Sequence, residues 1–290
     1  MNLPKLNNFQ IDDVIKSALK EDVTSWDIST NAIYDDDKLA KIALISKDNG
    51  IISGLDVFKR CFKILDDEIF FVDYKKDGDS IDKGDLVLEI VGRASSILTA
   101  ERVALNFLQR MSGIASLTKN MIDALDDDNI ALVDTRKTTP NLRIFEKYSV
   151  RIAGGNNHRY NLSDGIMLKD NHIDAAGSIK RAVSLVREAE PFIKKIEVEV
   201  ENLDMLREAL DSKVDIIMLD NMDIDTIKEA INIIDGRALI ECSGNVEIDN
   251  ISRFKNLKID FISSGSLTHS AKSLDFSLKN LRYIDEWNSI

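Results

Sequence analysis

The sequence predicts an α/β protein in which an N-terminal α+β unit precedes a parallel α/β barrel. Two observations lead to this prediction. From about residue 131 to residue 264, short apolar runs rich in Val and Ile alternate with segments of helical periodicity, a pattern typical of parallel strands joined by crossover helices. Before residue 105, short strand-like segments are separated by glycine-containing turns. With 290 residues, of which 44% are hydrophobic, the chain is long enough to bury both cores.

The N-terminal unit is expected over residues 1–105. Three segments have the pattern of strands and hairpins: 50–62, 68–85 and 86–98. The acidic loop around Gly78 and Gly84 resembles a calcium loop, but Lys75 stands where a ligand oxygen is needed and no Glu closes it, so turn chemistry is the better interpretation. Residues 99–125 then carry apolar side chains at helical spacing and are expected to form a helix that connects the two units.

The barrel is expected from six apolar runs: 130–134, 164–169, 195–200, 214–220, 238–242 and 259–264. Helical periodicity is clear in three of the intervening segments: 178–190, 203–210 and 225–234. A doubly wound sheet would have the same alternation. The barrel is favoured because glycine-rich turns, ECSGN and SSGS, follow the last two runs, and barrels often build phosphate sites from the loops after their late strands.

Charge and composition exclude several classes of partner. The formal net charge is -12 and no basic arm offsets it, so nucleic acids and anionic membrane surfaces are repelled. No apolar run approaches the roughly 20 residues that span a bilayer, and the first residues lack the features of a secretory signal. Cys61 and Cys242 are the only cysteines, without a disulfide or zinc-site pattern. A cytoplasmic protein is expected.

Charged residues of both signs follow the predicted strands, where the site of a parallel α/β fold lies. The basic residues are Arg136, Lys137, His158, Arg159 and Lys169. The acidic residues are Glu197, Glu199 and Glu201, which share one face of their strand by the period of two, and Asp220, which ends the next strand. Backbone N–H groups of the two glycine-rich turns, at Ser243 and Gly244 and at Ser264, Gly265 and Ser266, suit a phosphate.

A ligand with several negative charges, together with a divalent cation, explains these features. Carboxylates on adjacent strands suit Mg²⁺. A structural charge network, with Glu199 and Asp220 paired to Lys169 and Arg136, is the alternative. No nucleophile stands out, because Cys242 lacks a designated base, and His269 could serve a phosphate loop or lie on the surface. The expected reaction depends on charge placement and a metal-bound leaving group, without a covalent intermediate.

Ordered motifs over nearly the whole chain resemble quinolinate phosphoribosyltransferases. They are EDVTSWDIST, TAERVALNFLQRMSGIA, DTRKTTPNLR, GGNNHR, IMLKDNHI, EVEVENL, IMLDN, ECSGNV and SSGSLTHS. The resemblance implies an N-terminal α/β sandwich over 1–105 that the C-terminal tail, 267–290, completes. It also implies an incomplete, type II phosphoribosyltransferase-like barrel over 106–266, in a homodimer or a hexamer.

The resemblance further implies a reaction and a set of roles. A pentosyltransferase of this kind joins quinolinate to phosphoribosyl pyrophosphate with decarboxylation, giving nicotinate mononucleotide, pyrophosphate and CO₂ for NAD biosynthesis. By resemblance, the quinolinate carboxylates contact Arg136, His158, Arg159 and Lys169, and Arg102 is contributed across the dimer interface. Lys137 contacts the ribosyl donor, Glu199 and Asp220 lie near Mg²⁺, and the catalytic set is Lys137, Lys169, Glu199 and Asp220. The remaining substrate-binding residues are Thr135, Ser243, Gly244, Asn245, Ser264, Gly265 and Ser266.

Four positions depart from the family pattern, and two alternative functions stay open. Asn141, Asn161, Ala153 and Trp26 stand at positions where glycine is usual; Asn tolerates the left-handed region, so the turns are expected to survive. A paralogue, such as a molybdenum-associated relative or a nicotinate phosphoribosyltransferase, tends to lose part of the basic set that is complete here. A sensor of phosphorylated sugars would not need the acidic pair. The group that protonates C2 after decarboxylation is open between the lysines 137 and 169.

Overall fold

The computed structural model describes residues 5–33, 38–192 and 195–284. The chain forms two compact units, the first built from 1–119, 139–154 and 271–290 and the second from 120–138 and 155–270. The expected ranges are 1–105 with the tail 267–290, and 106–266; in the structure, residues 106–119 and 139–154 also belong to the first unit, and residues 267–270 belong to the second. Within residues 139–154, helix α5 (Arg143–Ile152) places Phe145 against Phe107, with ring centroids 5.0 Å apart, in the buried core of the first unit.

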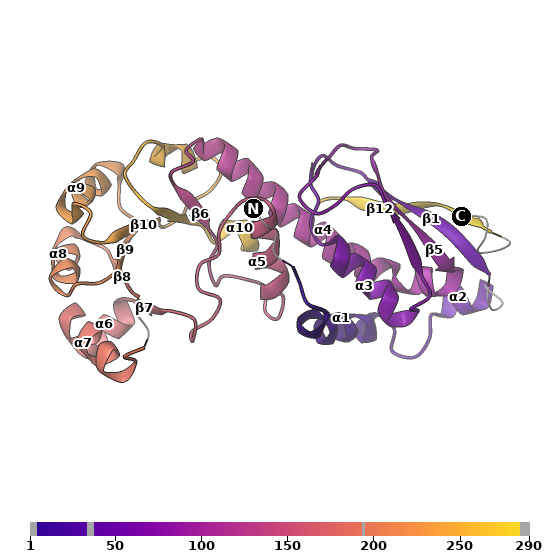
Figure 1. The fold of residues 1–290 in the computed structure, drawn as a ribbon, viewed down its shortest axis with the longest axis horizontal. Helices are drawn as coiled ribbons and strands as arrows, with labels where there is room; N and C mark the ends of the chain where they lie inside the picture. Colours follow the sequence, from indigo (N-terminus) through magenta and orange to yellow (C-terminus); the bar gives the residue numbers. More distant parts are fainter. Residues whose placement is uncertain (1–4, 34–37, 193–194, 285–290) are drawn as a thin grey trace. The chain divides into compact units, whose positions relative to one another are not determined.

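The first unit is built around an antiparallel sheet with the strand order β12-β1-β5-β3 (Figure 1). Strand β12 comes from the C-terminal tail. Residues of β1 alternate between buried and partly buried positions, so the sheet buries one face, as the period of two requires. The strands are β1 (Leu39–Ser46), β3 (Phe70–Asp73), β5 (Leu86–Arg93) and β12 (Phe276–Tyr283), with a separate pair, β2 (Gly50–Ile51) and β4 (Ser80–Ile81). Its helices are α1 (Asn8–Asp22), α2 (Ile28–Ile33), α3 (Leu55–Leu65), most of α4 (Ala94–Leu125) and α5.

Helix α3 corrects the prediction of strands and hairpins for residues 50–62. Leu55, Phe58 and Phe62 recur three and four residues apart and are buried, which is a helical spacing. The carboxylate of Asp77 accepts the N–H groups of Gly54 and Leu55 at 2.8 and 3.0 Å, at the start of this helix. The acidic loop therefore caps α3, in line with its interpretation as turn chemistry. Residues 94–98, also expected in a hairpin, begin α4.

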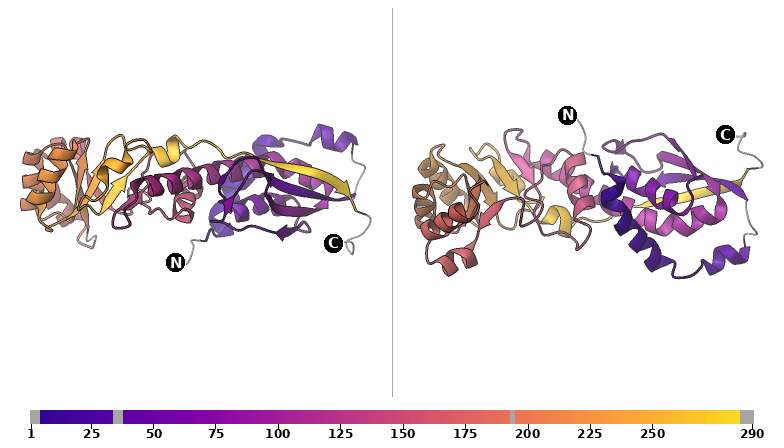
Figure 2. Two further views of the ribbon diagram at one scale, coloured as in Figure 1. Left: turned by 90° about the horizontal axis from the view of Figure 1, so that it is seen from above. Right: turned by 60° about the horizontal axis from the view of Figure 1, so that its bottom comes forward.

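The second unit contains all six predicted parallel strands, in the order β6-β11-β10-β9-β8-β7. The last strand, β11, pairs with the first, β6, as the last and first strands of an α/β barrel do. In the described residues β6 and β7 are not paired, so the barrel is incomplete. Figure 2 shows the helices between these strands, salmon to orange, gathered together at the barrel. The strands are β6 (Ala131–Val133), β7 (Ile166–Leu168), β8 (Ile196–Val200), β9 (Ile216–Asp220), β10 (Leu239–Ser243) and β11 (Phe261–Ser263).

The barrel helices confirm the predicted periodicity. Side chains of Ser178, Asn202 and Asp223 accept backbone N–H groups of the first turns of α7, α8 and α9, so each helix begins at a defined residue. The helices are α6 (Asp170–Ala176), α7 (Ile179–Ala189), α8 (Leu203–Asp211), α9 (Ile224–Ile234) and α10 (Ser266–His269), with a 3₁₀ turn at Ile251–Phe254. No helix in the described part of the chain combines the length and apolarity needed to cross a bilayer.

The departures from the family pattern are accommodated locally. Asn141 has a φ of 65°, the left-handed conformation that a glycine would also adopt, so the prediction that Asn preserves this turn is confirmed. Asn161 accepts the N–H of Ser163 through its side chain at 2.8 Å. Ala153 is buried with a negative φ and is followed by Gly154 at φ 94°. Trp26 is exposed in the first unit.

Candidate active site

A cavity of about 570 Å³ lies at the carboxyl ends of the barrel strands. Its position is the one expected for a parallel α/β barrel. All of its lining residues belong to the second unit. They are Thr135, Arg136, Lys137, His158, Arg159, Met167, Lys169, Glu199, Met218, Asp220, Asn221, Glu241, Ser243, Gly244, Asn245, Val246, Glu247, Ser263, Gly265, Ser266 and His269.

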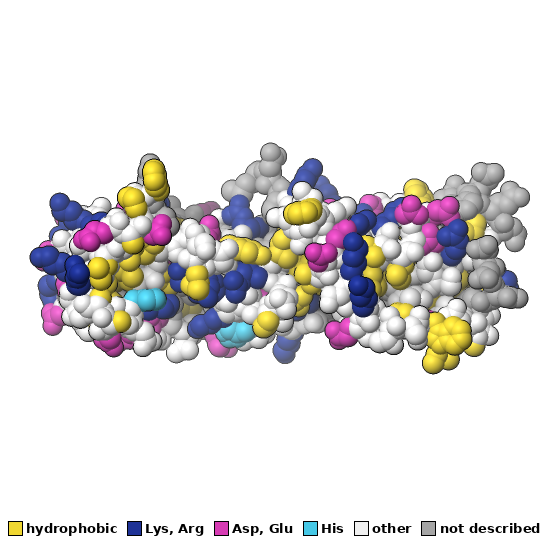
Figure 3. Space-filling view, turned by 90° about the horizontal axis from the view of Figure 1, so that it is seen from below, with side chains coloured by type: hydrophobic (Ala, Val, Ile, Leu, Met, Phe, Trp, Pro, Cys, Tyr) yellow, Lys and Arg dark blue, Asp and Glu magenta, His cyan; other side chains and the backbone are white. Residues whose placement is uncertain are grey.

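The predicted basic residues of the barrel meet in this cavity, and Figure 3 shows Lys and Arg side chains gathered near histidine in the part that carries the parallel sheet. The backbone of Lys137 is held from two sides. Its N–H is donated to Thr135 Oγ1 at 3.0 Å, and its carbonyl accepts the hydroxyl of Thr268 at 2.8 Å. The chain is thus fixed at Lys137 while its side chain stays exposed at the cavity.

The predicted acidic pair lies on the same wall, on neighbouring strands. Glu199 belongs to β8 and Asp220 ends β9, and the two strands pair in parallel. The ammonium of Lys169 donates to Glu199 Oε2, and the amide of Asn221 donates to Asp220 Oδ2 at 2.7 Å. Part of the alternative structural charge network therefore exists, in the form of the Lys169–Glu199 ion pair.

Arg159 lies among charges of both signs. Its Nη1 donates to the carbonyl of Gly165 at 2.9 Å. Burial lowers the pKa of Arg159, and the positive charge of Arg136 lowers it further, while Glu197 acts in the opposite direction. Two guanidinium groups held near each other repel, so an anion bound between them would relieve an unfavourable arrangement.

The two predicted phosphate loops leave little room for a side chain at their glycines. Gly244 has a φ of 102°, and a Cβ there would lie 2.3 Å from Asn221 Oδ1. A Cβ on Gly265 would lie 2.9 Å from Lys137 Cδ and 3.1 Å from the ring of His269. Backbone therefore approaches the cavity closely at both turns. His269, left open by the sequence, lines the cavity.

The serines of the second loop use their hydroxyls within the loop. Ser264 Oγ donates to the carbonyl of Val246 at 2.6 Å and lies 2.7 Å from Ser266 Oγ. The backbone N–H of Ser264 donates to the carbonyl of Val133. Ser264 is not among the residues that line the cavity, whereas Ser266 is. Arg102 lies exposed in the first unit, on α4, and is also absent from the cavity lining.

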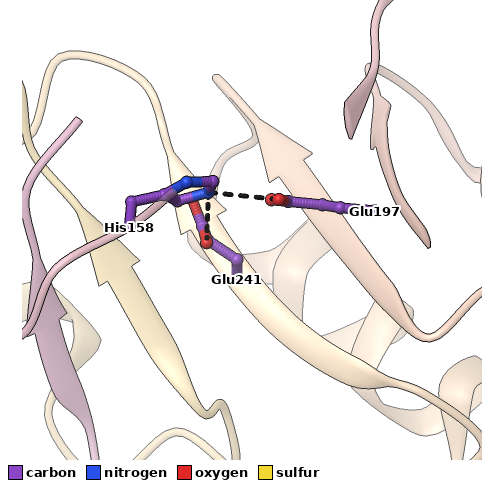
Figure 4. Close-up of side chains that lie close together, drawn as sticks. All are labelled: His158, Glu197 and Glu241. Atoms are coloured by element: carbon purple, nitrogen blue, oxygen red, sulfur yellow. Dashed lines mark ion pairs between the residues drawn. The ribbon is translucent and has the colours of Figure 1, made fainter. Parts of the chain in front are cut away.

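One cluster was not foreseen from the sequence. His158, Glu197 and Glu241 point toward one another across the barrel interior, from the segment after α5 and from β8 and β10 (Figure 4). His158 Nε2 lies 3.1 Å from Glu197 Oε2 and 3.5 Å from Glu241 Oε2. The signal for Glu241 was a lone charge within the apolar run ALIEC.

Hydrogen bonds fix the proton on the His158 ring. The N–H of Arg159 is donated to His158 Nδ1 at 2.7 Å, so Nδ1 is an acceptor and the proton must be on Nε2, which faces Glu197. The N–H of His158 is itself donated to the buried carboxylate of Asp134 at 3.0 Å. The ring therefore presents its Nε2–H to the two glutamates.

The two glutamates are among the most buried charged residues of the barrel, with exposed fractions of 5% for Glu197 and 2% for Glu241. Burial raises the pKa of Glu241 to about 7 and the charge of Glu197 adds to the shift, while His158, the Ser263 hydroxyl and Lys169 act oppositely. Oε1 of each glutamate finds no hydrogen-bond partner among the described residues.

A second cavity, of about 280 Å³, lies at the amino ends of the strands. Ile166, Ile216 and Phe261, which line it, begin β7, β9 and β11. Three residues line both cavities: His158, Arg159 and Glu241. The other residues of the second cavity are Val133, Asn157, Asp164, Gly165, Lys195 and Glu197. The cluster of Figure 4 thus lies between the two cavities.

Comparisons with known proteins agree on one family. The family model for the quinolinate phosphoribosyl transferase N-terminal domain matches residues 27–112, and the model for its C-terminal domain matches residues 114–279. A probable nicotinate-nucleotide pyrophosphorylase (carboxylating) from Bacillus subtilis is 40% identical over 273 residues, covering 94% of each chain. A protein of the same description from Archaeoglobus fulgidus is 44% identical over 252 residues, covering 84% of this chain and 96% of its own.

Among solved structures, NadC from Streptococcus pyogenes is similar over nearly the whole fold. It shares 58% sequence identity and a TM-score of 0.95, covering 97% of this chain and 100% of that chain. The similarity spans both compact units, so the barrel cavity described above lies within the compared region.

Proposed function

The chain belongs to the quinolinate phosphoribosyltransferase family, and from this premise we infer its reaction. It transfers the phosphoribosyl group of phosphoribosyl pyrophosphate to quinolinate, giving nicotinate mononucleotide, pyrophosphate and CO₂ in NAD biosynthesis. The observation that carries this conclusion is the single cavity that gathers four exposed or partly exposed cations beside two carboxylates. The cations are Arg136, Lys137, Arg159 and Lys169, and the carboxylates are Glu199 and Asp220.

For quinolinate we propose Arg136, Arg159 and Lys169 as the residues that bind its two carboxylates. The repulsion between the two guanidinium groups supports this, because a dianion between them is stabilised by both. His158 has both ring nitrogens engaged, so a contact from His158 to the substrate would require one of these bonds to be exchanged. Arg136, Arg159 and Lys169 therefore account for most of the proposed recognition of quinolinate.

For the ribosyl donor we propose the two glycine-centred loops and Lys137. Gly244 and Gly265 let the backbone approach a phosphate closely, with Ser243 and Asn245 beside the first turn. Lys137 packs against Gly265 and supplies a cation for the pyrophosphate. Ser264 supports the loop through its bond to Val246 rather than through direct contact with the donor.

We propose Mg²⁺ as the cofactor, held by Glu199 and Asp220. Their carboxylates end paired strands and line the cavity, and Mg²⁺ accepts a few such oxygens together with phosphate oxygens. When bound, Mg²⁺ neutralises charge on the departing pyrophosphate. Glu199 is bonded to Lys169 in this structure, so use of Glu199 as a ligand would free Lys169 for a substrate carboxylate.

The chemistry then follows from charge placement. The bond from the ribose C1 to pyrophosphate stretches toward an oxocarbenium-like state while Lys137 compensates the leaving-group charge. The pyridine nitrogen attacks the opposite face of C1. The resulting positive nitrogen stabilises the electron pair left at C2 when the adjacent carboxylate departs as CO₂. C2 must finally receive a proton.

Assembly and location are also proposals. Arg102 lies exposed on α4 and outside the cavity lining, which is compatible with a homodimer in which Arg102 serves the partner subunit's site. A hexamer of such dimers would share this feature. We place the protein in the cytoplasm, on the ground that its two cysteines are free and buried.

The reaction is tested by incubating purified protein with quinolinate, phosphoribosyl pyrophosphate and Mg²⁺, and by measuring pyrophosphate and CO₂ together. We expect equal amounts of both, and no turnover when Mg²⁺ is removed by a chelator. Pyrophosphate without CO₂ would indicate a different acceptor, such as the substrate of a paralogue. Binding without either product would indicate a sensor.

A further inference from the structure

The reaction consumes a proton at C2, and the cluster between the two cavities is placed to deliver it. We propose a relay in which Glu241 supplies this proton to C2 in the active cavity, and protons from solvent return to Glu241 through the cavity at the amino ends of the strands. This inference rests on the proposed function, because it assigns a step of the same reaction. It adds Glu241 and the second cavity to the site.

The first support is position. Glu241 lines both cavities, so its carboxyl group can give a proton to one cavity and regain a proton from the other. The amino-end cavity is also lined by the exposed residues Asp164 and Lys195, so it reaches the surface of the barrel. The two lysines of the site have other proposed roles. Lys137 is proposed to contact the pyrophosphate, and Lys169 is paired with Glu199.

The second support is the protonation of the ring. His158 can donate only from Nε2, because Nδ1 accepts the N–H of Arg159, and Nε2 lies 3.5 Å from Glu241 Oε2. The same three side chains have the composition of a metal site. A metal on Nε2 would need the ring proton on Nδ1, where the Arg159 N–H already points. The arrangement therefore favours a proton over a metal ion.

The third support is the pair of carboxyl groups. Glu197 and Glu241 each bury one oxygen without a partner among the described residues, and two buried carboxylates that share one histidine cannot both be ionised without cost. The charged groups facing the cluster are Asp134 next to β6, Arg159, Lys169 after β7, Glu197 of β8 and Glu241 of β10. Burial and Glu197 raise the pKa of Glu241 to about 7, so Glu241 holds a proton in part of the molecules at neutral pH.

The bond from C2 to its carboxylate breaks, CO₂ leaves and the electron pair stays on C2. The carboxyl group of Glu241 passes its proton to C2, while His158 keeps its Nε2–H directed at the two glutamates. Glu241 is then a carboxylate, and a proton from water in the amino-end cavity restores the acid. No oxidant or reductant is involved.

The ring can be observed directly, because the chain has only three histidines. In protein labelled with ¹⁵N-histidine, long-range ¹H–¹⁵N spectra separate the tautomers, and His158→Asn identifies the signals of His158. We expect the Nε2–H tautomer in the ligand-free protein. An Nδ1–H tautomer, or conversion to it when ZnCl₂ is added, would overturn the relay and identify a metal site.

The relay itself is tested with Glu241→Gln, which keeps the size of the side chain but cannot supply a carboxyl proton. We expect pyrophosphate release to stay within a few-fold of wild type, CO₂ and nicotinate mononucleotide to form about 10²-fold more slowly, and quinolinate mononucleotide to accumulate. Glu241→Asp should restore part of the CO₂ release. Glu229→Gln, the same change on the exposed face of α9, is the control and should leave both products unchanged.

The outcomes separate this inference from the proposed function. If wild-type protein releases no CO₂, the proposed function fails, whereas the tautomer measurement stands independently. If wild-type protein is active and Glu241→Gln releases CO₂ at the wild-type rate, the relay is wrong. An equal loss of pyrophosphate and CO₂ release in a variant with unchanged melting temperature would also overturn it, because Glu241 would then act on binding.

Discussion

Lys169 and Glu199 form an ion pair at the carboxyl ends of the neighbouring strands β7 and β8. Glu199 is 12% exposed and Lys169 is 42% exposed, so the pair belongs to the cavity wall and is partly open to ligands. Each member has a separate proposed partner, a substrate carboxylate for the lysine and Mg²⁺ for the glutamate. Without substrates, each member compensates the charge of the other. Neither charge is then left unpaired in the partly buried cavity wall.

We predict that Lys169→Ala weakens the use of quinolinate more than the use of the ribosyl donor. Removing a charged hydrogen bond of about 1.5–3 kcal/mol corresponds to a loss of roughly tenfold to a hundredfold in kcat/KM for quinolinate. Steady-state kinetics with each substrate varied in turn measure this. Lys228→Ala, on the exposed side of α9, is the matched control. Equal losses for both substrates would contradict the assignment of Lys169 to quinolinate.

Alanine substitutions at the glycines of the two loops should have different effects, one on substrate binding and the other on stability. In Gly265→Ala the added Cβ meets the flexible Lys137 side chain, so we expect a raised KM for phosphoribosyl pyrophosphate and little change in melting temperature. In Gly244→Ala the Cβ meets Asn221, including its backbone nitrogen at 2.7 Å, at a φ of 102°, so the melting temperature should fall.

Gly236→Ala is the control for the loss of stability expected in Gly244→Ala. Gly236 also has a positive φ, of 71°, but no atom lies within 4 Å of an added Cβ. It therefore reports backbone strain alone, on the order of 1–2 kcal/mol. If Gly244→Ala is no less stable than Gly236→Ala, the close approach of Asn221 does not restrict that loop.

The sequence predicted the barrel well because its signals are local. Each of the six strands is a short apolar run, and each periodic segment became a helix with its own cap. The ends of parallel strands meet at one edge by topology alone, so the gathering of Arg136, Lys137 and Lys169 near Glu199 and Asp220 could be expected without coordinates.

What the sequence could not show depends on partners far apart in the chain. Glu241 is a single charge in an apolar strand, and its role follows only from His158 across the barrel. The loop SSGS has the composition of a phosphate site, yet Ser264 is bound to Val246, which only the backbone geometry reveals. Helix α3 was mistaken for strand because a glycine turn and Val, Ile and Phe residues obscured its helical spacing.

A partly buried hydroxyl in the first unit, that of Tyr148, should contribute to stability in a pH-dependent way. The hydroxyl of Tyr148 donates to Asp77 at 2.7 Å, on the carboxylate that caps α3. We expect Tyr148→Phe to cost about 1 kcal/mol of unfolding free energy at neutral pH. Tyr74→Phe removes a hydrogen bond of the same length to Glu89 on the exposed surface and should cost less.

The sign of the pH effect follows from Asp77. Burial raises the pKa of Asp77, while Tyr148 and the two backbone N–H groups lower it. The Tyr148 hydroxyl stabilises the ionised form, so its loss matters most at neutral pH and least when Asp77 is protonated in acid. Urea unfolding of both variants near pH 7 and in acid measures this. A larger cost in acid would contradict the hydrogen bond as its source.

Glu241 should make the protein less stable as the pH rises. Its pKa in the folded protein is about 7, above the ordinary value of 4.5. A group with a raised folded pKa stabilises the fold below its unfolded pKa, and this contribution is lost as the pH rises through the folded value. The loss should therefore occur between about pH 4.5 and pH 7 and amount to about 3 kcal/mol at most.

Urea unfolding of wild type and Glu241→Gln at pH 5 and pH 8 tests this prediction. The glutamine cannot ionise, so the unfolding free energy of the variant should change less between the two pH values than that of wild type. Glu229→Gln again serves as the exposed control and should follow wild type. Parallel pH dependences of wild type and Glu241→Gln would show that Glu241 does not titrate within this range.

Arg102 provides the test of a site shared between subunits. Arg102→Ala and Lys137→Ala should each be nearly inactive alone. If Arg102 serves the partner's cavity, mixed dimers contain one cavity with both residues intact, so an equal mixture after subunit exchange should recover about a quarter of wild-type activity. Lys137→Ala mixed with Lys169→Ala is the matched control and should recover nothing, because both residues line the same cavity of one barrel. A mixture of the first pair that stays at the sum of its components would show that Arg102 does not act across the interface.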